Sequence, residues 1–587
     1  NDFEIGKRHD LEIINILNLD GTLNESVPEK FRGLTTTEAR EEVLNELESL
    51  GHLNKVEPHK IQIPKSQRSD SVLEPLITNQ WFVDVKKMSK EAIRVVQENE
   101  TGFIPKNWEN TYFNWMDDIQ DWCISRQLWW GHRIPAWFDE DENIYVGRSE
   151  DEVREKYGLT GIELHQDKDV LDTWFSSWLW PISVFDGIRY PKNKEIQYYY
   201  PTQDLVTGPD ILFFWVARMI MSGYAFREEK PFSKVYLTGL VRDKKGRKMS
   251  KQLGNSPDAL KLIDNFGADA VRVGLMLSSA AGNDLLFDDS LCQQGKNFTN
   301  KIWNAYRLIV GWEIKEDLKA PEVAMEALEW YENNFEKTLA WVDENFEKYR
   351  ISDALMSIYK LVWEDFCSWL LELIKPEYGQ PIDRQTYSKV IVLFEKNLRI
   401  LHPFMPFLTE ELWHFITDRK PEHALTVSSW PEAQDFNEKC IYNFELAQQI
   451  IAGIRNFRKQ KNISHKEKIS LYINADKSSF NFKSTILKLG GVSEMNFSSP
   501  PKGLIGGNFR ITNLELFIPT NTAENPEEEK KKLTLELNYT KGFLSSVEKK
   551  LSNKHFVANA PDKVIDLERK KASDAREKIL LLETKVG

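Results

Sequence analysis

The spacing of hydrophobic residues changes near residue 258 of this 587-residue chain. Beyond that point apolar residues recur at positions i, i+3 and i+4, the pattern of helices that bury one face. This recurrence predicts a helix bundle that ends near residue 434. The predicted helices span residues 297–310, 324–347, 352–374, 385–401 and 409–416.

Before residue 258, short apolar runs alternate with glycine turns and helical stretches. The order strand, turn, helix, strand is typical of a doubly wound parallel sheet, whose ligands lie beyond the carboxyl ends of the strands. The acidic segment 139–169, with a helix at 150–157, interrupts this order and predicts a surface insertion.

The first 66 residues predict a smaller α/β piece. Strands are expected at 11–17 and 61–63, and a helix at 36–50 begins with the capping residues Thr36 and Thr37 and the charge of Glu38.

After the bundle, residues 443–462 predict an amphipathic helix that ends in basic residues, among them Arg455 and Arg458. These arginines either complement the helix dipole or face RNA. A small α/β unit follows, with strands at 469–473 and 514–518. Heptad-like leucines in the last 60 residues predict an antiparallel helical hairpin.

The segment from Val235 to Pro257 carries the strongest sign of chemistry. An apolar strand, in which Gly239 lets a neighbour approach closely, leads into a loop with six basic residues and then to Ser256 and Pro257, which suit a helix start. Two lysines three residues apart in a mobile loop could neutralise a polyphosphate, although a solvated basic loop is the common alternative. The basic residues are Arg242, Lys244, Lys245, Arg247, Lys248 and Lys251.

Composition limits the classes of function. The net charge of −13 means that any RNA contact has to use local basic patches. Four cysteines stand far apart without a C-x-x-C pair, so we expect no structural zinc and a reducing compartment. Neither a long apolar segment nor a signal peptide is present in the sequence, which favours a cytoplasmic protein without a membrane span.

The sequence Lys248-Met249-Ser250-Lys251-Gln252 resembles the KMSKS loop of class I aminoacyl-tRNA synthetases, with glutamine in place of the last serine. The whole chain resembles the valyl-tRNA synthetases from the end of their editing insertion onward. The stretches that carry this resemblance are NDFEIGKRHDL, WCISRQLWWGHRIPAWF, DVLDTWFSSWLWP, LVTGPDILFFWVARMIM, GLVRDKKGRKMSKQLGN, GKNFTNKIWNA and the final hairpin.

The resemblance implies a multidomain protein of mixed α/β and all-α class. Its parts would be the end of an editing domain, the second half of a Rossmann-type catalytic domain, a helix-bundle anticodon-binding domain, a small α/β junction and an antiparallel coiled-coil tRNA-binding arm. The expected ranges are 1–66, 67–290, 291–434, 435–520 and 521–587.

The resemblance also implies substrates and sites. ATP with Mg²⁺, valine and tRNA(Val) are the expected partners of a monomeric enzyme. Lys248 and Lys251 would neutralise the phosphates, and Met249 would lie near the adenine. The remaining implied ATP contacts are Gly208 and Asp210, on the ribose side, and the implied valine pocket consists of Trp174, Ile211 and Trp215.

Asp210 has a second interpretation as the cap of a helix at 211–221. For editing, Asp2 matches the residue that holds the substrate amino group. The implied tRNA contacts are Lys296, Asn297, Phe298, Arg455 and Arg458; Phe298 could instead belong to the bundle core.

The sequence contains no His-x-Gly-His motif, and it begins inside a matching stretch. We therefore expect a fragment that is inactive alone. Two alternatives remain: a tRNA-binding module without catalysis, and an isoleucyl-tRNA synthetase. Ile211 and the absence of a cysteine-rich tail argue against the second alternative.

Overall fold

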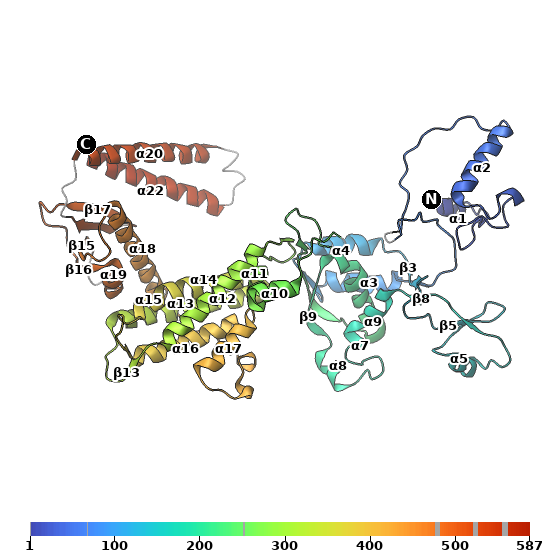
Figure 1. The fold of residues 1–587 in the computed structure, drawn as a ribbon, viewed down its shortest axis with the longest axis horizontal. Helices are drawn as coiled ribbons and strands as arrows, with labels where there is room; N and C mark the ends of the chain where they lie inside the picture. Colours follow the sequence, from blue (N-terminus) through green and yellow to red (C-terminus); the bar gives the residue numbers. More distant parts are fainter. Residues whose placement is uncertain are drawn as a thin grey trace. The chain divides into compact units, whose positions relative to one another are not determined.

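The computed structural model describes residues 2–66, 69–250, 253–475, 482–512, 514–520, 526–553 and 562–586 (Figure 1). The chain forms two compact units, Asn1–Leu237 and Thr238–Gly587. Each unit contains an extended hydrophobic core of its own.

The core of the first unit surrounds a three-stranded parallel sheet with the strand order β2-β10-β9. The strands are β2 Gly102–Ile104, β10 Phe232–Leu237 and β9 Thr202–Thr207. Val235 of the central strand pairs with Phe103 on one side and with Leu205 on the other. Burial of Val235, Tyr236 and Leu237, whose side chains point to both faces of the sheet, explains why the second half of β10 is an apolar run.

Helices α3 and α9 pack against each other, and α4 contacts strand β2. The amphipathic helix α3 turns Ala92, Val95 and Val96 into the core. These helices are α3 Lys86–Gln97, α4 Trp108–Asp117 and α9 Ala217–Arg227.

Two short antiparallel strand pairs, β1 with β3 and β4 with β8, lead to the helices α6, α7 and α8. The strands are β1 Phe82–Val83, β3 Trp122–Cys123, β4 Ser125–Arg126 and β8 Val170–Leu171. The helices are α6 Thr173–Ser177, α7 Trp180–Ser183 and α8 Lys194–Tyr199.

The acidic segment forms a small antiparallel sheet, β6-β5-β7, with one helix. Its elements are β5 Ala136–Phe138, β6 Ile144–Val146, α5 Glu150–Tyr157 and β7 His165–Gln166. The helix predicted at 150–157 is confirmed, with Ser149 as its cap.

The strands expected at 11–17 and 61–63 are wrong: helices α1 Asp2–Arg8 and α2 Thr36–Ser49 are the regular elements of this region, apart from a short 3₁₀ turn and isolated bridges. The apolar side chains in both runs are mostly exposed, so they gain little by forming a sheet. Helix α2 is confirmed, but its cap is Thr35 rather than Thr36, in a reciprocal capping box with Glu38.

The second unit is built on the predicted helix bundle, and all five predicted helical segments are helical. Residues 352–374 are not a single α-helix, because a π-helical stretch, η4 Leu361–Leu370, interrupts them. The bundle helices are α12 Asp289–Val310, α13 Glu322–Glu347, α14 Ile351–Lys360, α15 Leu371–Ile374, α16 Arg384–Leu401 and α17 Pro406–Ile416. A short parallel pair, β13 Ile314–Lys315 with β14 Ile382–Asp383, joins two of the connections.

The bundle core continues without a break into the small α/β part. Its four-stranded sheet has the order β16-β15-β18-β17. Its elements are α18 Glu438–Gln460, β15 Ile469–Ile473, α19 Lys483–Gly490, β16 Val492–Asn496, β17 Gly506–Ile511 and β18 Leu514–Pro519.

A side chain of the bundle caps helix α19. The carboxylate of Glu326, on α13, accepts hydrogen bonds from the backbone nitrogens of Ser484 (3.4 Å) and Thr485 (3.1 Å) and from the Thr485 hydroxyl (2.9 Å). Burial raises the pKa of Glu326, and these hydrogen bonds oppose that shift.

The last two helices, α20 Pro526–Ser552 and α22 Asp562–Val586, lie side by side (Figure 1). Lys541 pairs with Glu583 and Arg576 pairs with Glu548, so the two helices run in opposite directions. Within the described ranges, no helix is both long and apolar enough to span a membrane.

Candidate functional site

The turn that follows strand β9 carries several of the predicted site residues. Gly208 precedes the 3₁₀ turn η2 Pro209–Ile211, which runs into a π-helical stretch, η3 Leu212–Val216, before α9 begins. Such π-helical turns are rare and frequently mark functional sites. Gly208 is half-buried and Asp210 is exposed at the carboxyl end of the parallel sheet, where ligands of such sheets bind. The residues at the cap positions of η2 and η3 are Gly208 and Ile211, and neither makes a side-chain capping hydrogen bond, so the capping interpretation of Asp210 stays a prediction.

The three residues predicted to form the valine pocket come from two segments that touch. The Trp174 ring, on α6, stacks on Phe214 of the π-helical stretch, with 5.9 Å between ring centroids. The Trp215 indole nitrogen donates to the Ser177 carbonyl oxygen at 3.0 Å. Ile211 directly precedes the same stretch and is half-buried, as are both tryptophans.

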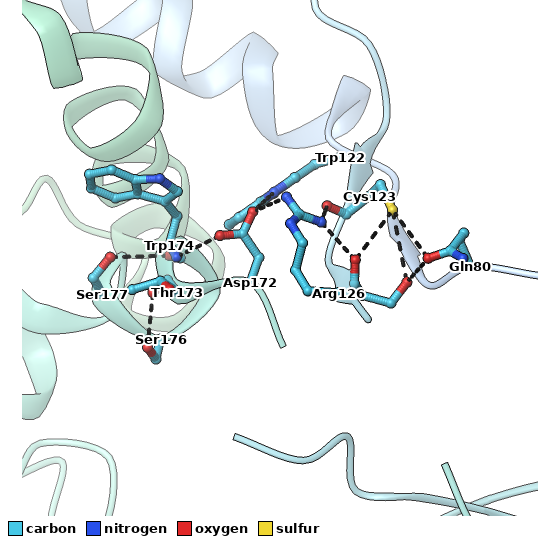
Figure 2. A network of polar contacts seen from close by, with 10 residues as sticks. Gln80, Trp122, Cys123, Arg126, Asp172, Thr173, Trp174, Ser176 and Ser177 are labelled. Carbon is cyan, nitrogen blue, oxygen red and sulfur yellow. Dashed lines mark hydrogen bonds and ion pairs between the residues drawn. The ribbon is translucent and has the colours of Figure 1, made fainter. Parts of the chain in front are cut away.

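A buried carboxylate holds the start of helix α6 (Figure 2). Asp172 is 6% exposed and accepts hydrogen bonds from the Trp122 indole nitrogen (3.1 Å), Arg126 Nη2 (2.5 Å) and the Trp174 backbone nitrogen (2.9 Å). The Arg218 guanidinium lies 3.6 Å from the centroid of the Trp122 ring. Burial lowers the pKa of Arg218 to about 10, and the Asp172 charge opposes that shift.

Trp122, Arg126, Asp172 and Arg218 were not among the residues predicted from the sequence. Trp122 and Arg126 lie in WCISRQ, Asp172 lies in DVLDTWF and Arg218 lies in FFWVARMIM, within stretches noted for their resemblance. The first two stretches are rich in tryptophans, which are usually buried, and each contains a charged residue. Because buried charges are normally paired, this combination could have indicated an ion pair between those two stretches.

The lysine loop belongs to the second unit. Strand β11 Val241–Arg242 pairs in parallel with β12 Leu285–Leu286. The close approach expected at Gly239 is confirmed, since a Cβ atom there would lie 1.6 Å from the Asn283 carbonyl oxygen. After the loop, Asp258 rather than Ser256 caps helix α10 Ala259–Phe266, which α11 Ala268–Leu277 follows.

Asp243 and Asn255 tie the two ends of this loop together. The Asn255 amide donates to Asp243 Oδ2 (3.0 Å) and to the Lys248 carbonyl oxygen (3.3 Å), and its oxygen accepts from the Ser250 backbone nitrogen (2.9 Å). The Asp243 carboxylate also accepts from the backbone nitrogens of Lys245 and Arg247. Hydrogen bonds from the Asn255 side chain and from Arg247 hold the pKa of Asp243 well below its ordinary value.

Lys248, one of the two predicted phosphate-binding residues, takes part in this tie through its carbonyl oxygen. Lys248 is exposed and Met249 is half-buried. Lys251 lies outside the described residues. Of the two lysines expected to bind phosphate, the structure therefore describes Lys248, together with the base of the loop.

Two of the three predicted anticodon-contacting residues on α12 are at least partly accessible. The Lys296 ammonium donates to the Asn265 carbonyl oxygen (2.7 Å), and Asn297 is exposed. Phe298 is 0% exposed and packs on Tyr359 and Trp363. Its prediction as a base-stacking platform is wrong, and the alternative that it belongs to the core is confirmed.

The two arginines at the end of α18 differ. Arg455 is exposed, whereas Arg458 is 2% exposed and donates to four backbone carbonyl oxygens. These belong to Ser464 (2.8 Å), Glu467 (2.9 Å), Gly490 (3.3 Å) and Gly491 (2.9 Å). The prediction that Arg458 contacts RNA is wrong, because its guanidinium is buried among these carbonyls.

Helix α1 begins at Asp2, but the Asp2 side chain lies outside the described part of the structure. Among the residues that the structure describes, no group of three or more histidine, cysteine, aspartate or glutamate side chains could hold a metal ion.

Three family models match successive parts of the chain. Residues 2–288 match the tRNA synthetases class I (I, L, M and V), residues 329–473 match the anticodon-binding domain of tRNA ligase, and residues 526–586 match the valyl tRNA synthetase tRNA binding arm.

Curated relatives match along the whole chain. Valine–tRNA ligase from Christiangramia forsetii is 51% identical over 99% of this chain and 67% of its own length. The enzymes from Phocaeicola vulgatus and Thermotoga maritima are 49% and 39% identical over 100% of this chain and 68% and 67% of their own lengths. With this identity from end to end and a matched valyl-specific arm, the chain belongs to the valine–tRNA ligase family of class I tRNA synthetases.

Proposed function

We propose that this chain acts in the ATP-dependent attachment of valine to tRNA(Val) through valyl-adenylate. The observation that carries the proposal is the contact between helix α6, which carries Trp174, and the Ile211–Trp215 segment. This segment follows the Gly208 turn at the carboxyl end of a parallel strand. Indole faces and a branched aliphatic side chain suit a small apolar amino acid. The turn beside them, with Gly208 and Asp210, would bind the ATP ribose.

In the first step the valine carboxylate attacks the α-phosphate of ATP, supplied with Mg²⁺, and pyrophosphate leaves. The second step transfers the valyl group to the terminal adenosine of tRNA. Both steps depend on positioning and on neutralising charge, so no protein nucleophile is required. Lys248 and Lys251 would neutralise the charge that develops on the phosphates, and Met249 would lie near the adenine.

Selectivity for valine would rest on Ile211, whose branched side chain narrows the space for isoleucine. An apolar site rejects threonine weakly, because threonine carries a hydroxyl group where valine carries a methyl group of similar size. In the full-length enzyme, hydrolytic editing of mischarged threonine would therefore accompany the proposed reaction, with Asp2 holding the amino group of the substrate. We do not expect editing from this chain alone.

For tRNA binding we propose Lys296, Asn297 and Arg455, together with the paired helices α20 and α22 acting as a coiled-coil arm. The proposed domain roles are those expected from the resemblance: end of the editing domain, Rossmann-type catalytic half, anticodon bundle, junction and arm. We also propose a monomeric enzyme of the cytoplasm.

The first test is valine-dependent exchange of pyrophosphate into ATP. The full-length enzyme should catalyse the exchange, and Lys248→Ala should lower its kcat about a hundredfold or more. Exchange that responds to isoleucine as well as to valine, or that survives loss of Lys248, would contradict the proposal.

The second test uses the chain on its own. Because its sequence contains no His-x-Gly-His motif, we propose that it gives no exchange alone but binds an ATP analogue weakly. A module that only binds tRNA would instead show binding with a steep dependence on salt and no effect of nucleotide.

A further inference from the structure

Helix α6 is too short to fix its own position. It has five residues, and isolated helices of this length do not persist in water. Its place therefore depends on contacts at its two ends. At the carboxyl end the Trp215 indole nitrogen donates to the Ser177 carbonyl oxygen (3.0 Å). At the amino end the Asp172 carboxylate accepts from the Trp174 backbone nitrogen (2.9 Å).

The Asp172 carboxylate is in turn held by Arg126, whose guanidinium also binds backbone carbonyl oxygens. Arg126 Nη2 donates to Asp172 at 2.5 Å, while Nη1 of the same guanidinium donates to the Cys123 carbonyl oxygen at 2.9 Å (Figure 2). Nη1 also donates to the Ser125 carbonyl oxygen at 2.8 Å. The Asp172 backbone nitrogen also donates to the Ile124 carbonyl oxygen (2.7 Å). Short charge-assisted hydrogen bonds of this kind are directional, so they transmit the position of strands β3 and β4 to α6.

The Ile211–Trp215 segment, which faces Trp174, is also connected to Asp172. Arg218 lies on α9, directly after the π-helical stretch that carries Trp215. Its guanidinium stacks on the Trp122 ring, and the Trp122 indole nitrogen donates to Asp172 (3.1 Å). Both segments that carry the proposed valine-pocket residues therefore connect to one buried carboxylate.

We infer that Asp172, held by Arg126, is a positioning residue that sets the separation between Trp174 and the Ile211–Trp215 segment, and so limits the size of the amino acid accepted. This inference rests on the proposed function, because it assigns the wall of the same site. Asp172 acts through Trp174 and need not touch the substrate.

The test is Asp172→Asn in the full-length enzyme, assayed by pyrophosphate exchange with valine, isoleucine and ATP varied in turn. Asparagine keeps the size of the side chain but loses the charge that orients Arg126. Losing one charge-assisted hydrogen bond should raise the KM for valine about tenfold or more. The preference for valine over isoleucine should fall several-fold, while the KM for ATP should stay within about twofold.

Arg126→Lys is the second variant, because it keeps the charge and loses the planar fork. It should raise the KM for valine less than Asp172→Asn does and leave the KM for ATP almost unchanged. If Asp172→Asn fails to fold, Arg126→Lys tests the positioning role in its place. Asp186→Asn, in an exposed pair with Arg189 in the same unit, is the matched control and should change neither KM.

The outcomes separate the two claims. A wild-type enzyme without valine-dependent exchange would overturn the proposed function. An active wild-type enzyme whose variants raise the KM for valine and ATP equally, or leave the preference over isoleucine unchanged, would overturn the role of Asp172 alone.

Discussion

Replacing Arg458 tests whether the end of helix α18 serves folding or RNA binding. The guanidinium is buried, and four of its hydrogen bonds go to backbone carbonyl oxygens of the 464–467 and 490–491 segments. Arg458→Met keeps most of the apolar stem and removes all four hydrogen bonds. The carbonyl oxygens would then lack their charged donor in a buried site.

The expected cost follows from these contacts. A hydrogen bond from a charged donor contributes about 1.5–3 kcal/mol, but four bonds from one group are not additive and water replaces some of them. Burial lowers the pKa of Arg458, which indicates that desolvation already opposes its charge. Each buried carbonyl oxygen left without a donor costs about 1–3 kcal/mol, so with partial replacement by water we expect a local loss of about 3–5 kcal/mol.

Hydrogen exchange of the amides in β15 and β16 measures this loss locally, because the long chain does not unfold in one step. A loss of 3–5 kcal/mol should speed that exchange by about a hundredfold to a few thousandfold, since each 1.4 kcal/mol is about tenfold. Arg455→Met, on the exposed face of the same helix, is the control and should change it little. If Arg458→Met left exchange unchanged and weakened tRNA binding, the structural role assigned to Arg458 would be refuted.

Three further predictions concern the bundle and the loop. Phe298→Ala should destabilise the bundle by about 3–5 kcal/mol, seen as faster hydrogen exchange of the α12 amides, because it empties a fully buried site; a variant with wild-type exchange and weaker tRNA binding would restore the stacking role. Asp243→Ala should loosen the lysine loop and speed tryptic cleavage at its basic residues, with Asp204→Ala on strand β9 as an exposed control; equal rates would contradict the tie. Burial raises the pKa of Asp365 to about 7, so the folded protein holds a proton that the unfolded chain releases above about pH 4. The contribution of Asp365 to stability is therefore complete below about pH 4 and is lost as pH rises to about 7; Asp365→Asn should remove that slope from chemical unfolding curves, and an unchanged slope would contradict it.

The bundle could be predicted from sequence because its signal is local. In α13 the apolar positions of one face fall on Ala327, Tyr331, Leu339 and Val342, all fully buried, and the predicted start is two residues from the observed one. Helix α5 was equally predictable, since Ser149 at its start and Gly158 at its end are ordinary capping residues.

Features that depend on contacts distant in sequence were not predictable. The run 11–17 looks like a strand, but within the described residues its one bridge joins Leu17 to Leu23, and most of its apolar side chains are exposed. The π-helical stretches η3 and η4 are five and ten residues long, only one or two turns, which is too short for their period to be distinguished from that of an α-helix in the sequence. Arg458 stands among exposed basic residues in the sequence, and only the fold reveals the carbonyls around it.

The same division holds for the candidate site. The residues Trp174, Ile211 and Trp215 were named from resemblance, and their placement on two touching segments follows from the fold. The pairing of Arg126 with Asp172 joins positions 46 residues apart, a distance over which no periodicity or spacing rule applies.

Because Glu326 of the bundle caps helix α19 of the small α/β part, these two parts of the chain cannot be separated, or exchanged singly between relatives, without loss. A chain cut between the bundle and the sheet would leave one piece with an ionisable carboxylate in an apolar surface and the other with unsatisfied amide groups at a helix start. Neither piece would then be an autonomous module. Recombination that transplants the bundle into another synthetase should succeed only when the α/β part travels with it.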